Sequence, residues 1–184
     1  GRLTDALQFY QKGAVAKSKV RLQASVYELK TLVHLDRYSD AQKLYKQIYT
    51  EFLPNYPLSQ TKVYAQIELA SHLIKMKSLQ ESSVHTNQQG NIKEDYLSIS
   101  AQLLANAYKD AQTLAHPRAE SIALGRLAGL YEQTQQWQNA IKLTTLALEK
   151  ARSLKADDIA YQWEWQLGRI FKAQSNIEKA ITNY

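Results

Sequence analysis

Apolar and small residues recur along the chain at spacings of three, four and seven positions, the periodicity of one face of an α-helix. Four segments share one arrangement, in which a large apolar residue and two polar residues precede an alanine. They are Leu3–Ala6, Tyr38–Ala41, Trp137–Ala140 and Ile177–Ala180. A fifth copy ends at Ser100, where serine replaces the alanine. Each segment predicts an amphipathic helix, and the shared pattern predicts that this helix is repeated.

A second repeated pattern lies upstream of these helices and predicts a partner helix for each. It consists of a large residue, a small one and a large or aromatic residue three further on, as in Leu127-Ala128 with Tyr131. The later copies are evenly spaced, because the interval from Leu127 to Leu167 equals that from Ala140 to Ala180. The chain is therefore expected to consist of repeated helical hairpins.

The predicted helices cover most of the chain. They are expected at 3–16, 19–35, 38–52, 59–77, 95–115, 117–134, 137–154, 157–174 and 177–184. Pro54, Pro57 and Pro117 lie between hairpins, where a helix has to end. The stretch 78–94 is rich in Ser, Gln and Asn and has no apolar period, so it predicts a mobile insert within one hairpin.

The last copy of the repeat resembles the tetratricopeptide family. The residues that carry this resemblance are Leu167, Gly168, Phe171, Ile177, Ala180 and Tyr184. The resemblance implies an all-α fold, a right-handed α-α superhelix of antiparallel hairpins. It covers nearly the whole chain, interrupted by the insert at 78–94, and implies a single repeat domain over residues 1–184 with about four and a half hairpins. The repeat is mostly longer than the family's, and Gln66, Leu124 and Glu164 stand where the family has tryptophan.

Two stretches, Ala119–Gly125 and Tyr161–Gly168, are also similar in texture to a narrower group. These are the tetratricopeptide arrays that precede a caspase-like (CHAT) peptidase domain in cyanobacterial multidomain proteins. The resemblance implies a non-catalytic protein-interaction module that binds a peptide, a partner helix or a neighbouring domain in its concave groove. Regulation of a caspase-like peptidase domain of the same protein is one form of this role.

The family's groove-facing positions map onto the first helix of each hairpin. They fall on Gln23, Val26, Lys30 and His34, then Tyr64, Ile67, Ser71 and Lys75, then Ile122, Gly125, Gly129, Glu132 and Gln133, and finally Gln162, Trp165, Arg169 and Lys172. The candidates for partner binding among them are Lys30, His34, Tyr64, Ser71, Lys75, Glu132, Gln162, Trp165, Arg169 and Lys172.

Trp163 and Trp165 are expected on different faces of one helix, because two residues correspond to a rotation of about 200°. Trp163 continues the apolar spacing of Leu167, which predicts a core position. Trp165 is in phase with Arg169 and Lys172. A tryptophan beside two cations could receive a carboxylate or an aromatic side chain. The alternative is that its indole packs against another hairpin while the cations are solvated.

The net charge of +6, from 23 basic and 17 acidic residues, makes nucleic-acid binding an alternative to test. A basic cluster at Lys12, Lys17, Lys19 and Arg21 could contact phosphates, or could be a solvated helix end. Helical-repeat RNA readers need one reading position in every repeat. The corresponding positions here, Lys30, Ser71, Gly129 and Arg169, share no chemistry.

Catalytic and metal-binding signatures are missing from the sequence. Cysteine is absent, and the four histidines have no spacing typical of a metal site. The adjacent Asp157 and Asp158 are interpreted as N-capping residues. We therefore expect no enzyme activity, no metal and no cofactor. A structural spacer or self-assembly element remains the alternative function.

The sequence also bears on location. No run of about 18 apolar residues occurs, so no membrane partner is expected. Gly1 is interpreted as a boundary inside a longer protein, and a cytoplasmic location is the working expectation. Partner identity and oligomeric state do not follow from these patterns.

Overall fold

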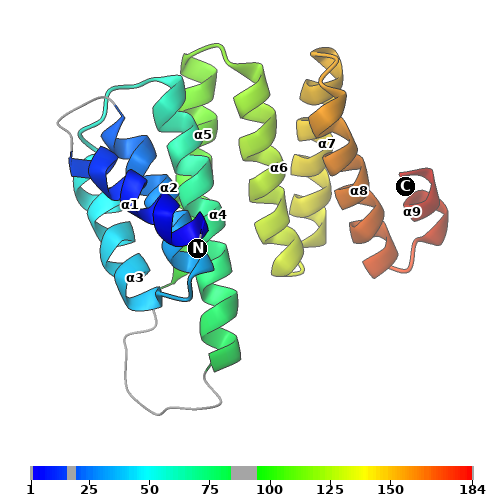
Figure 1. The fold of residues 1–184 in the computed structure, drawn as a ribbon. Helices are drawn as coiled ribbons and strands as arrows, with labels where there is room; N and C mark the ends of the chain where they lie inside the picture. The colour runs from blue at the N-terminus through cyan, green and yellow to red at the C-terminus, as the bar shows by residue number, and fades with distance from the viewer. Residues whose placement is uncertain (1, 16–19, 84–94, 184) are drawn as a thin grey trace. The chain divides into compact units, whose positions relative to one another are not determined.

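The computed structural model describes residues 2–15, 20–83 and 95–183, and all the regular structure in these ranges is helical (Figure 1). The helices are α1 (Arg2–Val15), α2 (Arg21–His34), α3 (Tyr38–Gln47), η1 (Ile48–Phe52), α4 (Gln60–Ser83), α5 (Tyr96–Thr113), α6 (Pro117–Gln133), α7 (Trp137–Ser153), α8 (Asp157–Ala173) and α9 (Ile177–Thr182). The prediction of an all-α chain is confirmed, and most helix ends lie close to their predicted positions.

One predicted helix end is wrong, and a second predicted helix keeps its bounds but changes its type of turn. Helix α4 continues to Ser83, so residues 78–83 are helical instead of belonging to a loop. The rest of the predicted insert, 84–94, lies outside the described residues. The predicted helix 38–52 changes to a π-helical turn at Ile48, where the N–H of Leu53 donates to the carbonyl oxygen of Ile48 at 2.9 Å. This helix ends just before Pro54, which has no N–H to continue it.

The contacts divide the chain into two compact units, residues 1–100 and 101–184. The prediction of one repeat domain stays a prediction. In the first unit, α2 contacts α1, α3, η1 and α4. Leu29, Leu69 and Leu73 are fully buried in its core. The hydroxyl of Ser100 donates to the carbonyl oxygen of Ala70 at 3.1 Å, which ties the start of α5 to α4.

In the second unit, α6 contacts both α7 and α8, α7 contacts α8, and α8 contacts α9 (Figure 1). The pairs α2–α4 and α6–α8 join first helices of successive hairpins, so these helices pack on each other in both units. Trp163 and Leu167 belong to the buried core of the second unit, which confirms the core position predicted for Trp163.

One type of turn ends five of the helices. The residue with positive φ in each is Asp36, Ala115, Gln135, Lys155 or Ser175. In each case the next residue donates its N–H to the carbonyl oxygen five positions earlier, as Gln136 does to Tyr131 at 2.8 Å. This is the Schellman arrangement that caps a helix C-terminus. The turns from Ala115 to Ser175 are evenly spaced along the chain, which explains the constant period of the later hairpins.

Buried polar groups in the second unit bond to one another across three helices. The indole Nε1 of Trp163 donates to the hydroxyl of Ser121 at 3.0 Å, and that hydroxyl donates to the carbonyl oxygen of Ala147 at 2.7 Å. The amide of Gln166 donates to Thr144 Oγ1 at 3.1 Å and to the carbonyl oxygen of Gly125 at 3.2 Å. These bonds fix the register of α8 against α6 and α7, because an unpaired buried polar group is costly.

Within the described ranges, none of the helices is both long enough and apolar enough to cross a membrane.

Candidate functional site

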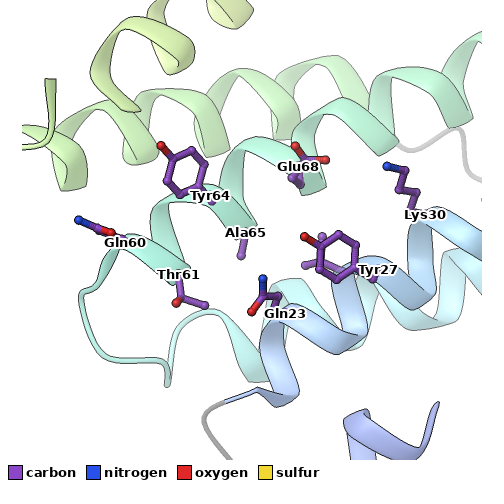
Figure 2. Close-up of a pocket in the computed structure, with 9 residues that line it drawn as sticks. Gln23, Tyr27, Lys30, Gln60, Thr61, Tyr64, Ala65 and Glu68 are labelled. Carbon is purple, nitrogen blue, oxygen red and sulfur yellow. The ribbon is translucent and has the colours of Figure 1, made fainter. Parts of the chain in front are cut away.

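A hollow of about 420 Å³ lies between α2 and α4 in the first unit (Figure 2). We call it the α2–α4 hollow. Its lining residues are Gln23, Val26, Tyr27 and Lys30 on α2, and Gln60, Thr61, Tyr64, Ala65 and Glu68 on α4. They recur at spacings of three and four, so each helix contributes one face. Because α2 and α4 are both first helices, the hollow lies on the surface that the sequence predicted to face a partner.

The lining combines two aromatic rings with opposite charges. Tyr27 is 39% exposed and stacks on Tyr10 of α1, with ring centroids 5.5 Å apart. Tyr64 is half-buried on the opposite wall. Figure 2 shows Lys30 and Glu68 towards one end of the hollow and Gln60 at the other. Aromatic rings with polar edges and a few charges are typical of surfaces that bind polypeptides.

His72 lies on α4, one turn beyond Glu68, and is only 7% exposed. Its Nε2 is 3.8 Å from a carboxylate oxygen of Glu68, too far for a hydrogen bond, and has no hydrogen-bond partner among the described residues. Burial, reinforced by the positive charges of Lys30, His34 and Lys75, lowers the pKa of His72 to about 4. The imidazole is therefore neutral at physiological pH and leaves Glu68 unneutralised beside the hollow.

The structure brings Lys30 and Tyr64, two of the predicted binding residues, together in the α2–α4 hollow. His34 and Lys75 are exposed nearby on α2 and α4, and they act on His72 through their charge. Ser71 is half-buried, and its hydroxyl donates to the carbonyl oxygen of Ile67 at 3.0 Å. His34, Lys75 and Ser71 do not line the hollow.

The predicted residues of the second unit are partly engaged with each other. Arg169 forms a bidentate ion pair with Glu132, with Nε–Oε1 at 3.0 Å and Nη2–Oε2 at 2.9 Å. The side chain of Gln162 donates to the carbonyl oxygen of Asp158 at 3.0 Å, within its own helix. Lys172 is exposed. The expectation that Arg169 stands ready for an acidic ligand is therefore replaced by an ion pair between α6 and α8.

Two further expectations are wrong. Gly125 is buried, not groove-facing, because a Cβ there would lie 2.4 Å from the Trp163 ring. The N-cap of α8 is Ala156, so Asp157 and Asp158 do not cap it. Asp158 instead pairs with Arg118, with Nη1–Oδ1 at 3.1 Å, and this guanidinium lowers the pKa of the carboxyl.

A second hollow, of about 350 Å³, lies beside α8 and the end of α9. We call it the α8–α9 hollow, and it is lined by Tyr161, Glu164, Trp165 and Asn183. Trp165 is 55% exposed there, as expected for a residue outside the core. The charge that accompanies it is the carboxylate of Glu164, not the two cations that the sequence suggested.

Sequence reasoning missed Tyr27 and Glu68 in the first hollow and Tyr161 and Glu164 in the second. Tyr27 follows Gln23 by four positions, and Glu68 follows Tyr64 by four, so their spacing carried a signal. On α4 the prediction holds at Tyr64 and fails at Ile67, which is buried while its neighbour Glu68 lines the hollow.

The basic cluster and the possible metal ligands form no further site among the described residues. Lys17 and Lys19 of the basic cluster lie outside the described residues. Lys12 lies over the ring of Phe9, 5.9 Å from its centroid, and Arg21 lies 4.1 Å over Phe52. In the part of the chain that the structure describes, no group of three or more His, Asp or Glu side chains is placed to hold a metal ion.

A scan of family models found no match for the sequence, and a search of curated proteins found none either. Among solved structures, the crystal structure of BtubC (BKLC) from P. vanneervenii is similar, with a TM-score of 0.73 and 16% sequence identity. The match covers 100% of this chain and 70% of that one. At this level of identity the likeness concerns the all-helical fold alone.

Proposed function

We propose that this chain is a non-catalytic protein-interaction module, a tetratricopeptide-like right-handed solenoid of helical hairpins. Its ligand is a peptide segment or partner helix held along the first helices of the hairpins. A neighbouring domain, such as a caspase-like peptidase domain of the same protein, could supply that segment. The observation that carries the proposal is the α2–α4 hollow.

The location of the α2–α4 hollow supports a polypeptide ligand. Both of its walls are first helices, and such a surface extends from hairpin to hairpin in a helical repeat. An extended ligand is therefore favoured over a small molecule enclosed on all sides. Tyr27 and Tyr64 provide large contact areas with few rotatable bonds, and tyrosine is enriched at protein interfaces for this reason.

The charges of the hollow add selectivity. Lys30 and Glu68 have opposite signs and come from opposite walls near one end of the hollow, so a ligand with a complementary pair would be held in one orientation across that end. Charge complementarity mainly determines which partner binds and how fast it associates. The neutral state of His72 keeps the Glu68 carboxylate available to such a ligand.

A second candidate function, self-assembly, is favoured by a different observation. Phe9 on α1 is 72% exposed and Ile181 on α9 is 70% exposed. Exposed large apolar side chains on these two helices would be covered if copies of the chain associated. Sedimentation of the chain without ligand over a range of concentrations measures this directly.

Selection from a displayed library of random peptides tests the proposed function. Peptides enriched on the wild-type protein are measured against Lys30→Glu and Tyr64→Ala, both within the hollow. Lys46→Glu on α3 is the matched control, because it makes the same charge change on an exposed position outside the hollow. We expect each hollow variant to weaken binding about fivefold or more, equivalent to about 1 kcal/mol, and the control to leave it unchanged.

Three outcomes would contradict the proposal. The first is a selection that enriches no peptide family. The second is equal binding by all variants, with circular dichroism showing each of them folded. The third is binding of single-stranded nucleic acid that disappears between about 50 and 200 mM salt, which would favour the alternative that the net charge raised.

A further inference from the structure

We propose that the α8–α9 hollow is a binding site for an arginine side chain of a partner polypeptide. This inference goes beyond the proposed function, because it concerns a separate site in the second unit and does not depend on the α2–α4 hollow. It rests on the aromatic walls of this hollow, on the sign of its charge and on a guanidinium contact already present at its edge.

The walls of the hollow are two aromatic rings on one face of α8. Tyr161 and Trp165 are four positions apart, so they are neighbours along the helix surface. They are 61% and 55% exposed, large fractions for aromatic residues within a helix. The volume of about 350 Å³ is at the small end of the range for ligand pockets, which suits one long side chain.

The charge within the hollow is negative. Glu164 is its charged lining residue, and Asn183 adds an amide. In the described part of the chain, no lysine or arginine belongs to the lining. An anionic ligand would face the carboxylate, and a purely apolar one would offer it no hydrogen bond beyond the one from Arg152. A cation is attracted both by the carboxylate and by the faces of the rings.

The protein itself shows that a guanidinium reaches this carboxylate. Nη2 of Arg152 donates to Oε1 of Glu164 at 2.8 Å, while Oε2 of Glu164 accepts no hydrogen bond from the described residues. The side chain of Arg152 is 64% exposed, so this contact is at the surface and contributes little to stability. A second guanidinium can therefore use Oε2, or displace Arg152 at small cost.

Arginine fits the hollow better than lysine. Its planar guanidinium stacks on an aromatic face while donating hydrogen bonds in its own plane. Its three methylene groups cover apolar surface of the rings at the same time. A lysine ammonium is a compact, strongly hydrated charge, so it makes weaker contacts with the two aromatic rings. We therefore expect the hollow to prefer arginine over lysine, and either of them over a neutral isostere.

The test is a titration with N-acetylarginine amide, observed through the indole N–H resonance of Trp165 by heteronuclear NMR. N-acetylcitrulline amide has the same shape without the charge, and N-acetyllysine amide has the charge without the plane. We expect saturable shifts with the arginine compound and binding of the citrulline compound that is weaker by about fivefold, the effect of about 1 kcal/mol.

Substitutions of the lining residues test whether the arginine compound binds in the α8–α9 hollow. Glu164→Gln and Trp165→Leu should each weaken arginine binding roughly two- to fivefold. The main-chain amide of Tyr161 serves as reporter where Trp165 is replaced. Lys172→Ala is the matched control, since Lys172 is an exposed residue of the same helix that does not line the hollow. Thermal unfolding of each variant establishes that it is folded before the titration is compared.

The proposal is overturned by any of four results. These are the absence of a saturable shift with the arginine compound, equal binding of the citrulline compound, tighter binding of the lysine compound, and unchanged affinity in Glu164→Gln. None of these results bears on peptides selected against the α2–α4 hollow, so the two proposals fail separately.

Discussion

The two units differ in whether their buried polar groups have hydrogen-bond partners. In the second unit, Trp163, Ser121, Gln166 and Thr144 satisfy one another across α6, α7 and α8. In the first unit, the hydroxyl of Ser25 and Nε2 of His72 are buried without a hydrogen-bond partner among the described residues. A buried polar atom left unsatisfied costs about 1–3 kcal/mol.

The difference coincides with the regularity of the chain. The second unit repeats one turn at equal intervals, while the first contains a π-helical turn and the long helix α4. The larger hollow also belongs to the first unit, and His72 lies close to it. The comparison indicates that buried hydrogen bonds fix the register of the helices in the second unit. In the first unit, the buried nitrogen of His72 that has no hydrogen-bond partner among the described residues lowers stability beside the candidate binding surface.

The largest effect expected from this difference between the units is a loss of stability in acid that arises from His72 in the first unit. In the folded chain the pKa of His72 is about 4, against 6.5 for an unperturbed histidine. The unfolded chain therefore binds the proton first as the pH falls. Stability contributed by neutral His72 is complete above about pH 6.5 and is lost progressively towards pH 4, up to about 3 kcal/mol in total.

Chemical unfolding between pH 4 and 7 measures this loss, and His72→Leu isolates it. The leucine has similar bulk and does not titrate, so subtraction removes the contributions of Glu68, Lys30, His34 and Lys75 around it. We expect the variant to lose most of the pH slope and to be no less stable than wild type near pH 5. If the pH dependence of the free energy of unfolding is unchanged in the variant, His72 is not the source of a difference in stability between the units.

The sequence was informative where one apolar face defined a helix. The helices of the second unit have regular periods and a repeated turn, so most of their ends were predicted closely. Helix α4 is different, because Val63, Ala65, Ile67, Leu69 and His72 are buried on several of its sides. A helix buried over most of its circumference has no sharp phase, which is why the prediction failed at Ile67 and Glu68.

The candidate sites were harder to predict for a related reason. Glu132 and Arg169 are 37 positions apart, and nothing in either helix alone indicates that they form an ion pair. The position of Trp165 outside the core followed from helix geometry, but the charge beside it did not. Glu164 lines the hollow because of how α9 follows α8, and this arrangement is a property of tertiary packing.

The next test concerns the tight packing of the second unit. A Cβ at Gly125 would lie 2.4 Å from ring atoms of the buried Trp163, so Gly125→Ala should lower the free energy of unfolding by about 1–3 kcal/mol. Gly129, one turn further along α6, is the matched control, since a Cβ there meets nothing within 4 Å. Gly129→Ala should raise stability by about 0.5–1 kcal/mol, because alanine favours the helix.

Urea unfolding of the two variants gives both values. Opposite signs would confirm that Trp163 is held firmly by its bond to Ser121 and cannot move aside. Equal, small effects would mean that the indole shifts at little cost, and the contrast between a fixed second unit and a looser first unit would not hold.

The smallest effect compares the same turn in the two units. Lys155 and Asp36 both have positive φ, which glycine adopts without strain. Lys155→Gly should therefore raise the free energy of unfolding by up to about 1 kcal/mol. Asp36→Gly gains less, because the Asp36 carboxylate accepts a hydrogen bond from the hydroxyl of Tyr38 that glycine cannot replace. If thermal unfolding shows an equal gain in both variants, that hydrogen bond contributes nothing, and the turn of the first unit is no more dependent on its side chain than the turns of the second.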